Sequence, residues 1–242
     1  MKHSTNPILV SIIIPVHNGA KLIQEALNSI HAQKYIDPTQ FEIIVIDDNS
    51  TDDTVNIVTT NSPSAQLLSC QEHNPGKARN HGLLKARGKF IAFLDHDDLW
   101  PEDKLFHQLN AFQTHPNADI VLGKIQYQAL PGHTLPPMQF SHPNNCLYHV
   151  HLGASLFKKT VFETIGYFDP NLRFSEDHDL FFRAREHALQ IIQSEPIALI
   201  YRIHAHNMTK NRTISDVQLN TVLRQSLKRR HTHNKQLPPW QK

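Results

Sequence analysis

The chain has 242 residues, a formal net charge of +2 at pH 7, 39% hydrophobic residues and 19% charged residues, which is ordinary for a globular protein with a full core and argues against nucleic acid as a partner. The apolar run Ile8–Val16 is too short to span a bilayer, and the first residues lack the apolar core of a signal peptide. With only two cysteines, Cys70 and Cys146, we expect reduced thiols and a cytoplasmic protein.

The first half of the sequence alternates strand-like and helix-like segments. Continuous apolar, β-branched runs predict buried strands, and apolar residues at helical spacing predict helices. The expected elements are strand Leu9–Pro15, helix Gly19–Ala32, strand Phe41–Ile46, a short helix capped by Asp52 or Asp53 and ending at Thr60, strand Ala65–Ser69, helix Lys77–Ala86, strand Phe90–Leu94, a helix from Pro101 to Gln113, and strand Asp119–Gln126. Such units predict a Rossmann-like α/β fold, with a mostly parallel central sheet flanked by helices.

The second half is less regular. Residues 129–150 are rich in Pro, His and Asn and predict a long loop, a feature that is often functional. The further elements are helix Lys158–Ile165, helix Glu176–His187, strand material over Ile191–His204 interrupted at Pro196, helix Ser215–Arg230 and a frayed basic tail, His231–Lys242. We expect one domain with a nucleotide-binding half (1–125), a smaller acceptor-side, catalytic half (126–214), and a C-terminal helix and tail (215–242).

Two acidic clusters carry the strongest chemical signal. Asp95-His96-Asp97-Asp98 directly follows a predicted strand, and Glu176-Asp177-His178-Asp179 opens a predicted helix. Carboxylates at the carboxyl edge of a parallel sheet lie where such sheets bind ligands, and their oxygens suit Mg²⁺ or Mn²⁺ beside a diphosphate. The alternatives are a charged turn for the first cluster and a helix cap for the second. The pattern favours metal-assisted transfer from a nucleotide-activated donor, with a base from the second cluster.

Other polar residues have two interpretations each. Asp48 ends a strand and can accept hydrogen bonds from a nucleobase or a ribose, or cap the next helix. Lys77 and Arg79 begin a helix, where anions bind, or are solvated surface charges. Trp100 either stacks on a sugar or packs in the core. The 18 histidines include the pairs His149-x-His151 and His204-x-His206, which are too weak to predict a zinc site.

Seven segments in order resemble the family 2 glycosyltransferases of the GT-A fold. They are Ser11–Gly19, Ile46–Thr54, Gly76–Gly82, Phe93–Asp98, Gly153–Ser155, Phe174–Asp179 and Tyr201–Thr209. One such motif alone would be weak, but the ordered set is specific for the family. It says little about the substrate.

The resemblance implies roles for individual residues. The nucleotide site would comprise Pro15, Asn18, Asp48, Lys77, Arg79, Asn80 and Asp95, with Asp48 on a uracil base. The metal site would comprise Asp97, Asp95 and His204. The catalytic pair would be Glu176 and Asp177, with Asp177 as the base and Asp179 as a second possibility. Donor or acceptor contacts would come from Trp100, Gly153, Ala154, Asp179 and Arg202, the arginine steadying the diphosphate or bracing the site.

The resemblance also implies the reaction. We expect an inverting, hexosyltransferase-type enzyme that uses Mn²⁺ or Mg²⁺ to move a sugar from a UDP-sugar to a hydroxyl of a surface glycan or a lipid-linked glycan. The oligomeric state stays open, and Lys228, Arg229 and Arg230 either contact an anionic membrane surface or form a solvated helix end. One alternative is a nucleotide-sugar-binding module without activity. Another is a sugar nucleotidyltransferase, whose Gly-rich basic loop is not found at Pro15–Gly19.

Overall fold

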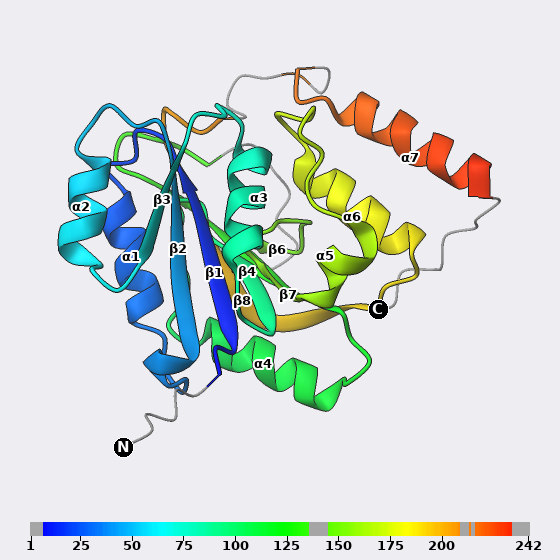
Figure 1. Ribbon diagram of the computed structural model, residues 1–242, viewed down its shortest axis with the longest axis horizontal. Helices are drawn as coiled ribbons and strands as arrows, with labels where there is room; N and C mark the ends of the chain where they lie inside the picture. The colour runs from blue at the N-terminus through cyan, green and yellow to red at the C-terminus, as the bar shows by residue number, and fades with distance from the viewer. Residues whose placement is uncertain (1–6, 136–144, 209–212, 214–215, 234–242) are drawn as a thin grey trace.

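The computed structural model describes residues 7–135, 145–208, 213 and 216–233. Within these residues one sheet has eight strands in the order β3-β2-β1-β4-β7-β5-β6, with β8 paired to β5 (Figure 1). The strands are β1 (Val10–Val16), β2 (Phe41–Asp48), β3 (Gln66–Cys70), β4 (Phe90–Phe93), β5 (Ile120–Ala129), β6 (Cys146–Leu147), β7 (Ser155–Lys158) and β8 (Ile191–Ile203). β1 to β4 are parallel, as are β5 and β8, whereas β7 runs antiparallel between β4 and β5.

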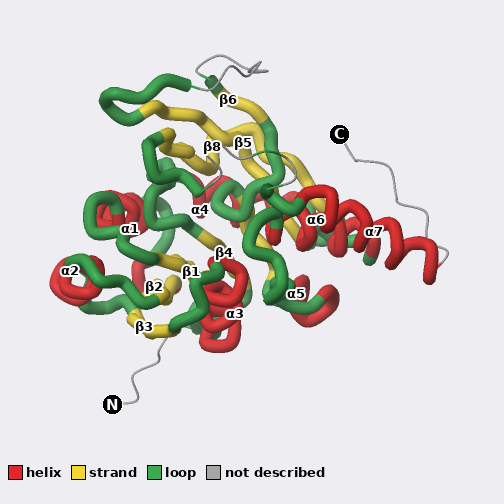
Figure 2. Tube along the Cα trace, turned by 90° about the horizontal axis from the view of Figure 1, so that it is seen from above, coloured by secondary structure: helices red, strands yellow, loops and turns green. Residues whose placement is uncertain are grey.

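Helices cover both faces of the sheet (Figure 2). They are α1 (Ile23–His31), α2 (Thr54–Asn61), α3 (Pro75–Lys85), α4 (Lys104–Thr114), α5 (Thr160–Ile165), α6 (Glu176–Glu186) and α7 (Leu219–His233), with a short 3-10 helix, η1, at Pro38–Gln40. Side chains of α1, α2 and α4 join one buried cluster, and those of α3, α5 and α6 join the other. α7 lies outside this arrangement and packs on α6 (Figure 1).

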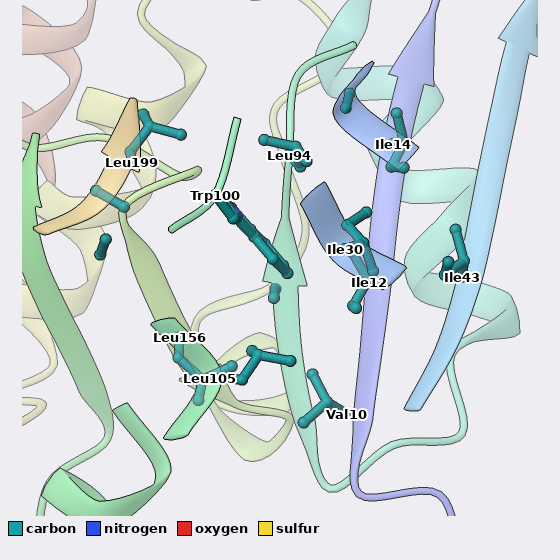
Figure 3. Close-up of a cluster of buried hydrophobic side chains, with 14 of the residues drawn as sticks. Val10, Ile12, Ile14, Ile30, Ile43, Leu94, Trp100, Leu105, Leu156 and Leu199 are labelled. Carbon is teal, nitrogen blue, oxygen red and sulfur yellow. The ribbon is translucent and has the colours of Figure 1, made fainter. Parts of the chain in front are cut away.

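Strand β1 shows why a continuous apolar run is needed at the centre of the sheet. Val10, Ile12 and Ile14 are fully buried in the cluster of α1 and α4, whereas Ile13 is buried in the cluster of α3. Figure 3 shows the first three beside Trp100. Because successive side chains of a strand alternate between faces, each position is buried, and each such side chain stabilises the fold by about 1.5–3 kcal/mol.

The expected order of elements in the first half is confirmed, but two helices begin later than predicted. α1 begins at Ile23 because the preceding turn is held from outside: the amide of Gly19 donates to Thr54 Oγ1 (2.8 Å) and that of Ala20 to Asp52 Oδ2 (3.0 Å). α4 begins at Lys104 because Pro101 lies in a turn whose carbonyl accepts from Lys104 N (3.2 Å).

The second half contains two short strands that were not predicted, β6 and β7. In addition, β8 is continuous through Pro196, because its register against β5 shifts after Gly123 and the proline needs no ladder hydrogen bond there. Residues 136–144 of the expected loop, Ser215 and the expected tail from residue 234 lie outside the described residues. Among the described residues, no helix combines the length and the apolar character that crossing a membrane requires.

Lys104 is a fully buried cation without an acidic partner among its contacts. Its Nζ donates to Gln108 Oε1 (2.6 Å) and to the carbonyl of Ser155 (3.4 Å), and lies 4.2 Å from the ring centre of Trp100. Burial lowers the pKa of Lys104 well below its usual value. In the unfolded chain the Lys104 amine keeps its proton up to a pH of about 10.4. In the folded chain the same amine binds that proton less strongly.

From this difference we predict that the free energy of unfolding rises with pH toward about 10, by up to about 1.4 kcal/mol per pH unit between the two pKa values. In the Lys104→Met variant, the free energy of unfolding should lack the increase with pH that comes from Lys104. Urea unfolding at several alkaline pH values measures it, with Lys85→Met as the control because Lys85 is exposed on α3. Equal slopes in the wild type and in Lys104→Met would contradict the prediction.

Candidate active site

Arg79 joins the two acidic clusters. Its guanidinium contacts Asp95 Oδ1 and Glu176 Oε1, each at 2.6 Å, and the residue is 4% exposed. Burial opposes the charge, but the two carboxylates raise the pKa of Arg79 above its usual value. Asp95 follows β4 and Glu176 begins α6, so one buried cation from α3 holds together two segments that are far apart in the sequence.

Asp97 and His204 form a second pair within the same region. Asp97 Oδ2 lies 2.9 Å from His204 Nε2, which connects the segment after β4 to the end of β8. Burial opposes ionisation, but the hydrogen bond from His204 and the charge of His96 lower the pKa of Asp97. The structure thus brings together two members of the predicted metal set.

Asp98 and His151 are site residues that the sequence did not single out. Asp98 is 1% exposed; its Oδ1 accepts from the amide of Arg202 (2.9 Å), and its Oδ2 has no hydrogen-bond partner among the residues that the structure describes. Burial and the charges of Asp97 and Asp95 raise the pKa of Asp98 well above its usual value. His151 precedes β7, and its Nδ1 accepts from the amide of Gly153 (3.1 Å).

These residues fit a divalent cation. One ligand atom from each of Asp95, Asp98 and His151 lies within 4.8 Å of the others. Crowded carboxylates are stabilised by a hard cation, and here Asp98 is buried and Asp95 is partly exposed. Burial lowers the pKa of His151, which favours the neutral ligand form. Asp97 pairs with His204 and Asp95 pairs with Arg79, so the predicted set of Asp95, Asp97 and His204 stays a prediction beside this cluster.

The acidic pair at the start of α6 has unequal surroundings. Asp177 Oδ1 lies 2.8 Å from His178 Nδ1. Burial opposes the ionisation of Asp177, but His178 lowers the pKa of Asp177 to about 2. Burial raises the pKa of the neighbouring Glu176. In turn the hydrogen bond to Asp177 raises the pKa of His178. The lowered pKa keeps Asp177 ionised, the protonation state that a base requires.

Asp48 organises a loop rather than offering a free carboxylate. Its side chain accepts from the amides of Glu72 (2.6 Å), His73 (3.0 Å) and Asn74 (3.1 Å). Burial opposes ionisation, but these hydrogen bonds lower the pKa of Asp48. The contact of this carboxylate with uracil stays a prediction, because Oδ1 accepts two of these amides and Oδ2 accepts one.

The turns after β1 and β2 meet at the carboxyl edge of the sheet. Asn18 follows β1, and its Oδ1 accepts from the amide of Thr51 (2.8 Å), which follows β2. His17 Nδ1 donates to the carbonyl of Asp48 (2.7 Å). Pro15 lies within β1 and is buried. The predicted base-pocket residues Pro15 and Asn18 therefore share one edge with Asp48.

Four residues that were predicted to contact the nucleotide, the donor sugar or the acceptor are buried or bonded within the protein. Both ends of the Asn80 side chain bond the backbone of Phe168, each at 2.9 Å, so Asn80 is occupied away from a nucleotide. Trp100 is 3% exposed and donates to the carbonyl of Gly153 (3.1 Å). Ala154 is fully buried, and a Cβ at Gly153 would lie 3.0 Å from Leu199 Cδ1. This corrects the expectation of donor or acceptor contacts for Trp100, Gly153 and Ala154.

Two further predicted residues also have internal partners. Arg202 is 1% exposed and contacts the side chain of Glu25 and the carbonyl of Asp97. It braces the segment after β4 and does not reach outward to a diphosphate. Asp179 is 2% exposed and is ion-paired with Arg183 (2.7 Å) and Arg229 (3.1 Å), which argues against Asp179 as the base.

Lys77 remains accessible at the start of α3. Its Nζ lies 3.1 Å from Glu72 Oε2, and its side chain is 38% exposed. The amide of Lys77 is capped by Asn74 Oδ1 (3.0 Å), but the helix dipole at this end favours anions, so a contact of the Lys77 side chain with a phosphate stays a prediction.

Comparison with known sequences decides the family. Residues 11–184 match the family model described as Glycosyl transferase family 2. The chain belongs to this family. An uncharacterized glycosyltransferase of Rickettsia prowazekii is 32% identical over 222 residues, covering 86% of this chain and 68% of that protein. The poly(ribitol-phosphate) beta-N-acetylglucosaminyltransferase TarS of Staphylococcus aureus is 31% identical over 173 residues, covering 69% of this chain.

Solved structures place the family 2 chain among GT-A glycosyltransferases. TarS residues 1–349 in complex with UDP-GlcNAc superpose with a TM-score of 0.71 at 25% identity, covering 90% of this chain and 65% of that one. A mannosyltransferase of Pyrobaculum calidifontis in complex with GDP-Man and Mn²⁺ has a TM-score of 0.67 at 19% identity and supports the fold alone. The chain spans 30% of full-length TarS and 60% of a second relative, an uncharacterized glycosyltransferase of Rickettsia typhi.

Proposed function

We propose that this family 2 glycosyltransferase moves a hexose-type sugar from a UDP-sugar to a hydroxyl acceptor, with inversion and with help from Mn²⁺ or Mg²⁺. The observation that carries the proposal is the buried contact of Arg79 with both Asp95 and Glu176. This contact supports the proposal because it connects the acidic segment after β4, which is suited to a cation, to the start of α6, where Asp177 is suited to act as a base.

In the proposed reaction Asp177 takes the proton of the acceptor hydroxyl. The acceptor oxygen attacks the anomeric carbon while the bond to the diphosphate breaks on the opposite face, so the configuration inverts. Asp177 is ionised in the resting site because His178 lowers its pKa, and Arg79 fixes the neighbouring Glu176. A cation bound by Asp95, Asp98 and His151, or by the alternative set of Asp95, Asp97 and His204, would offset the charge of the leaving diphosphate.

The proposed nucleotide site is the carboxyl edge of β1 to β4, where open α/β sheets bind ligands. The backbone of residues 70–74, which Asp48 holds, would contact the base beside Pro15 and Asn18, and Lys77 would contact the phosphates. TarS, which is similar to this chain, binds UDP and UDP-GlcNAc, and this supports a uridine-linked donor here.

The proposed acceptor is a hydroxyl of a surface glycan or of a lipid-linked glycan. Relatives act on poly(ribitol-phosphate), as their names state. Contact of α7 with an anionic surface would depend on Lys228, which is exposed. Arg229 is engaged by Glu186 (2.6 Å), which corrects its place among the expected membrane-facing residues.

Donor binding tests the proposal. Thermal unfolding is measured with UDP-GlcNAc, UDP-glucose and GDP-mannose, each with and without Mn²⁺. A UDP-sugar with Mn²⁺ at 100-fold its Kd should stabilise the fold by about 2.7 kcal/mol, and GDP-mannose should do so less. Release of UDP in the presence of an acceptor then measures transfer. If no UDP-sugar binds, the proposed donor is wrong.

The same assay tests which residues hold the cation. We predict that His151→Gln and Asp98→Asn each weaken Mn²⁺-dependent UDP binding at least about tenfold, because each removes a ligand. His115→Gln is the control, since His115 is exposed at the end of α4. A loss confined to Asp97→Asn and His204→Gln would instead support the set expected from the sequence.

Two other functions predict different outcomes. A binding module without activity would bind the donor but would neither hydrolyse nor transfer it. A nucleotidyltransferase would release diphosphate from UTP and a sugar phosphate. Either result, without sugar transfer to any hydroxyl acceptor, would overturn the proposed reaction.

A further inference from the structure

The segment before α6 has unusual backbone geometry. Ser175, the residue that precedes Glu176, has a left-handed conformation with φ of 57°. This region is unfavourable for residues other than glycine, asparagine and aspartate. The Ser175 carbonyl accepts from the amide of Asp179 (3.0 Å), but its side chain makes no capping hydrogen bond to α6. The direction in which Glu176 and Asp177 leave this turn therefore depends on contacts from elsewhere.

Besides the contact of Arg79 with Glu176, such contacts come from Val217 and Gln218, in the turn directly before α7. Gln218 Oε1 accepts from the amides of Arg173 (2.9 Å) and Phe174 (3.1 Å). Ser175 Oγ donates to the carbonyl of Val217 (2.7 Å). The three residues before the acidic pair are thus bonded one after another to two residues directly before a helix more than 40 positions later in the sequence.

α7 is itself fixed to α6, so it can act as a support. Glu186 accepts from Ser226 Oγ and from Arg229 Nε, each at 2.6 Å. Arg229 also lies 3.1 Å from Asp179, and Val222 is fully buried. The two helices therefore form one rigid pair, and Gln218 lies at the end of that pair next to the acidic residues.

From these contacts we infer that Gln218 is a positioning residue for the acidic pair. Its amide oxygen sets the turn at residues 173–175 and, through it, the orientation of Glu176 and Asp177. Gln218 lies beyond residues 11–184, which match the family model, so this chain completes its site with a segment outside that match. The inference depends on the proposed function, in which Asp177 is the base.

The test replaces the amide oxygen while keeping the size of the side chain. Gln218→Met removes the acceptor of two backbone amides, and Gln218→Glu keeps an acceptor in the same place. Because small displacements of a reacting group are costly, kcat of Gln218→Met should fall about 10- to 100-fold, with the Kd of the UDP-sugar within about twofold. Gln218→Glu should recover most of the loss. Asn220→Ala is the control, since Asn220 is exposed two residues further along, in the first turn of α7.

A second variant separates positioning from folding. Ser175→Gly removes the bond to Val217 but tolerates the left-handed backbone, so its melting temperature should change little while its kcat falls. If the wild type transfers sugar and both Gln218→Met and Ser175→Gly retain full kcat, the inference is wrong. If the wild type transfers no sugar, the proposed function fails first. A fall in melting temperature with unchanged kcat per folded molecule would also overturn the positioning role.

Discussion

Asp177→Asn is expected to lower kcat for sugar transfer by about 10²–10⁴, the usual contribution of a general base. The physical reason is that an amide cannot take the proton of the acceptor hydroxyl. Donor affinity should stay within about twofold, since Asp177 contacts His178 and not Arg79 or the carboxylates after β4. Steady-state UDP release, with the donor Kd from calorimetry, measures both quantities.

Two comparisons make this result specific. Glu163→Gln removes an exposed carboxylate from α5 and should leave kcat unchanged. Glu176→Gln should lower both stability and turnover, because it takes a partner from buried Arg79. Full turnover in Asp177→Asn would remove this residue from the proposed reaction.

Arg79→Met is expected to destabilise the protein by about 3–5 kcal/mol, the cost of stranding buried charges. Asp95 and Glu176 would lose the cation that lies 2.6 Å from each. Chemical denaturation measures the change in the free energy of unfolding. Sugar transfer should be lost as well, since the two acidic clusters would no longer be held together.

A surface ion pair provides the matched control. Arg87 is bonded to Glu42 at 2.7 Å; its side chain is 71% exposed and that of Glu42 is 10% exposed. Glu42 would keep its hydrogen bonds from Ser11 Oγ and from the amide at position 87, so Arg87→Met should cost less than Arg79→Met. Adding Glu176→Gln to Arg79→Met should restore part of the stability, because it removes one stranded charge. Equal losses for Arg79→Met and Arg87→Met would show that the buried contact is not strong.

The sequence predicted the fold well because its strongest patterns are local. The apolar run of β1 and the helical spacing in α1 and α4 are visible in short windows. The strand β6 was missed because two residues are too few for a periodic pattern. The four residues of β7 lie between the segment rich in Pro, His and Asn and the helix expected from Lys158. Helix starts were misplaced where distant side chains, such as Thr54 on the turn at Gly19, hold the chain.

The candidate site was only partly predictable, for a different physical reason. The acidic clusters were found because their spacing and their place after a strand are properties of the chain. His151 and Asp98 acquire their meaning from proximity, since three residues from two segments share one space only after folding. In the same way, the sequence does not show that the side chains of Asp48 and Asn80 accept hydrogen bonds from backbone amides.

The place of β7 has a consequence for protein engineering. This strand comes from the second half of the chain but pairs with β4 on one side and β5 on the other. A chimera that exchanged residues 126–214 for those of a relative would have to reproduce both of these edges at once. Grafting individual loops would disturb this pairing less than swapping the whole segment.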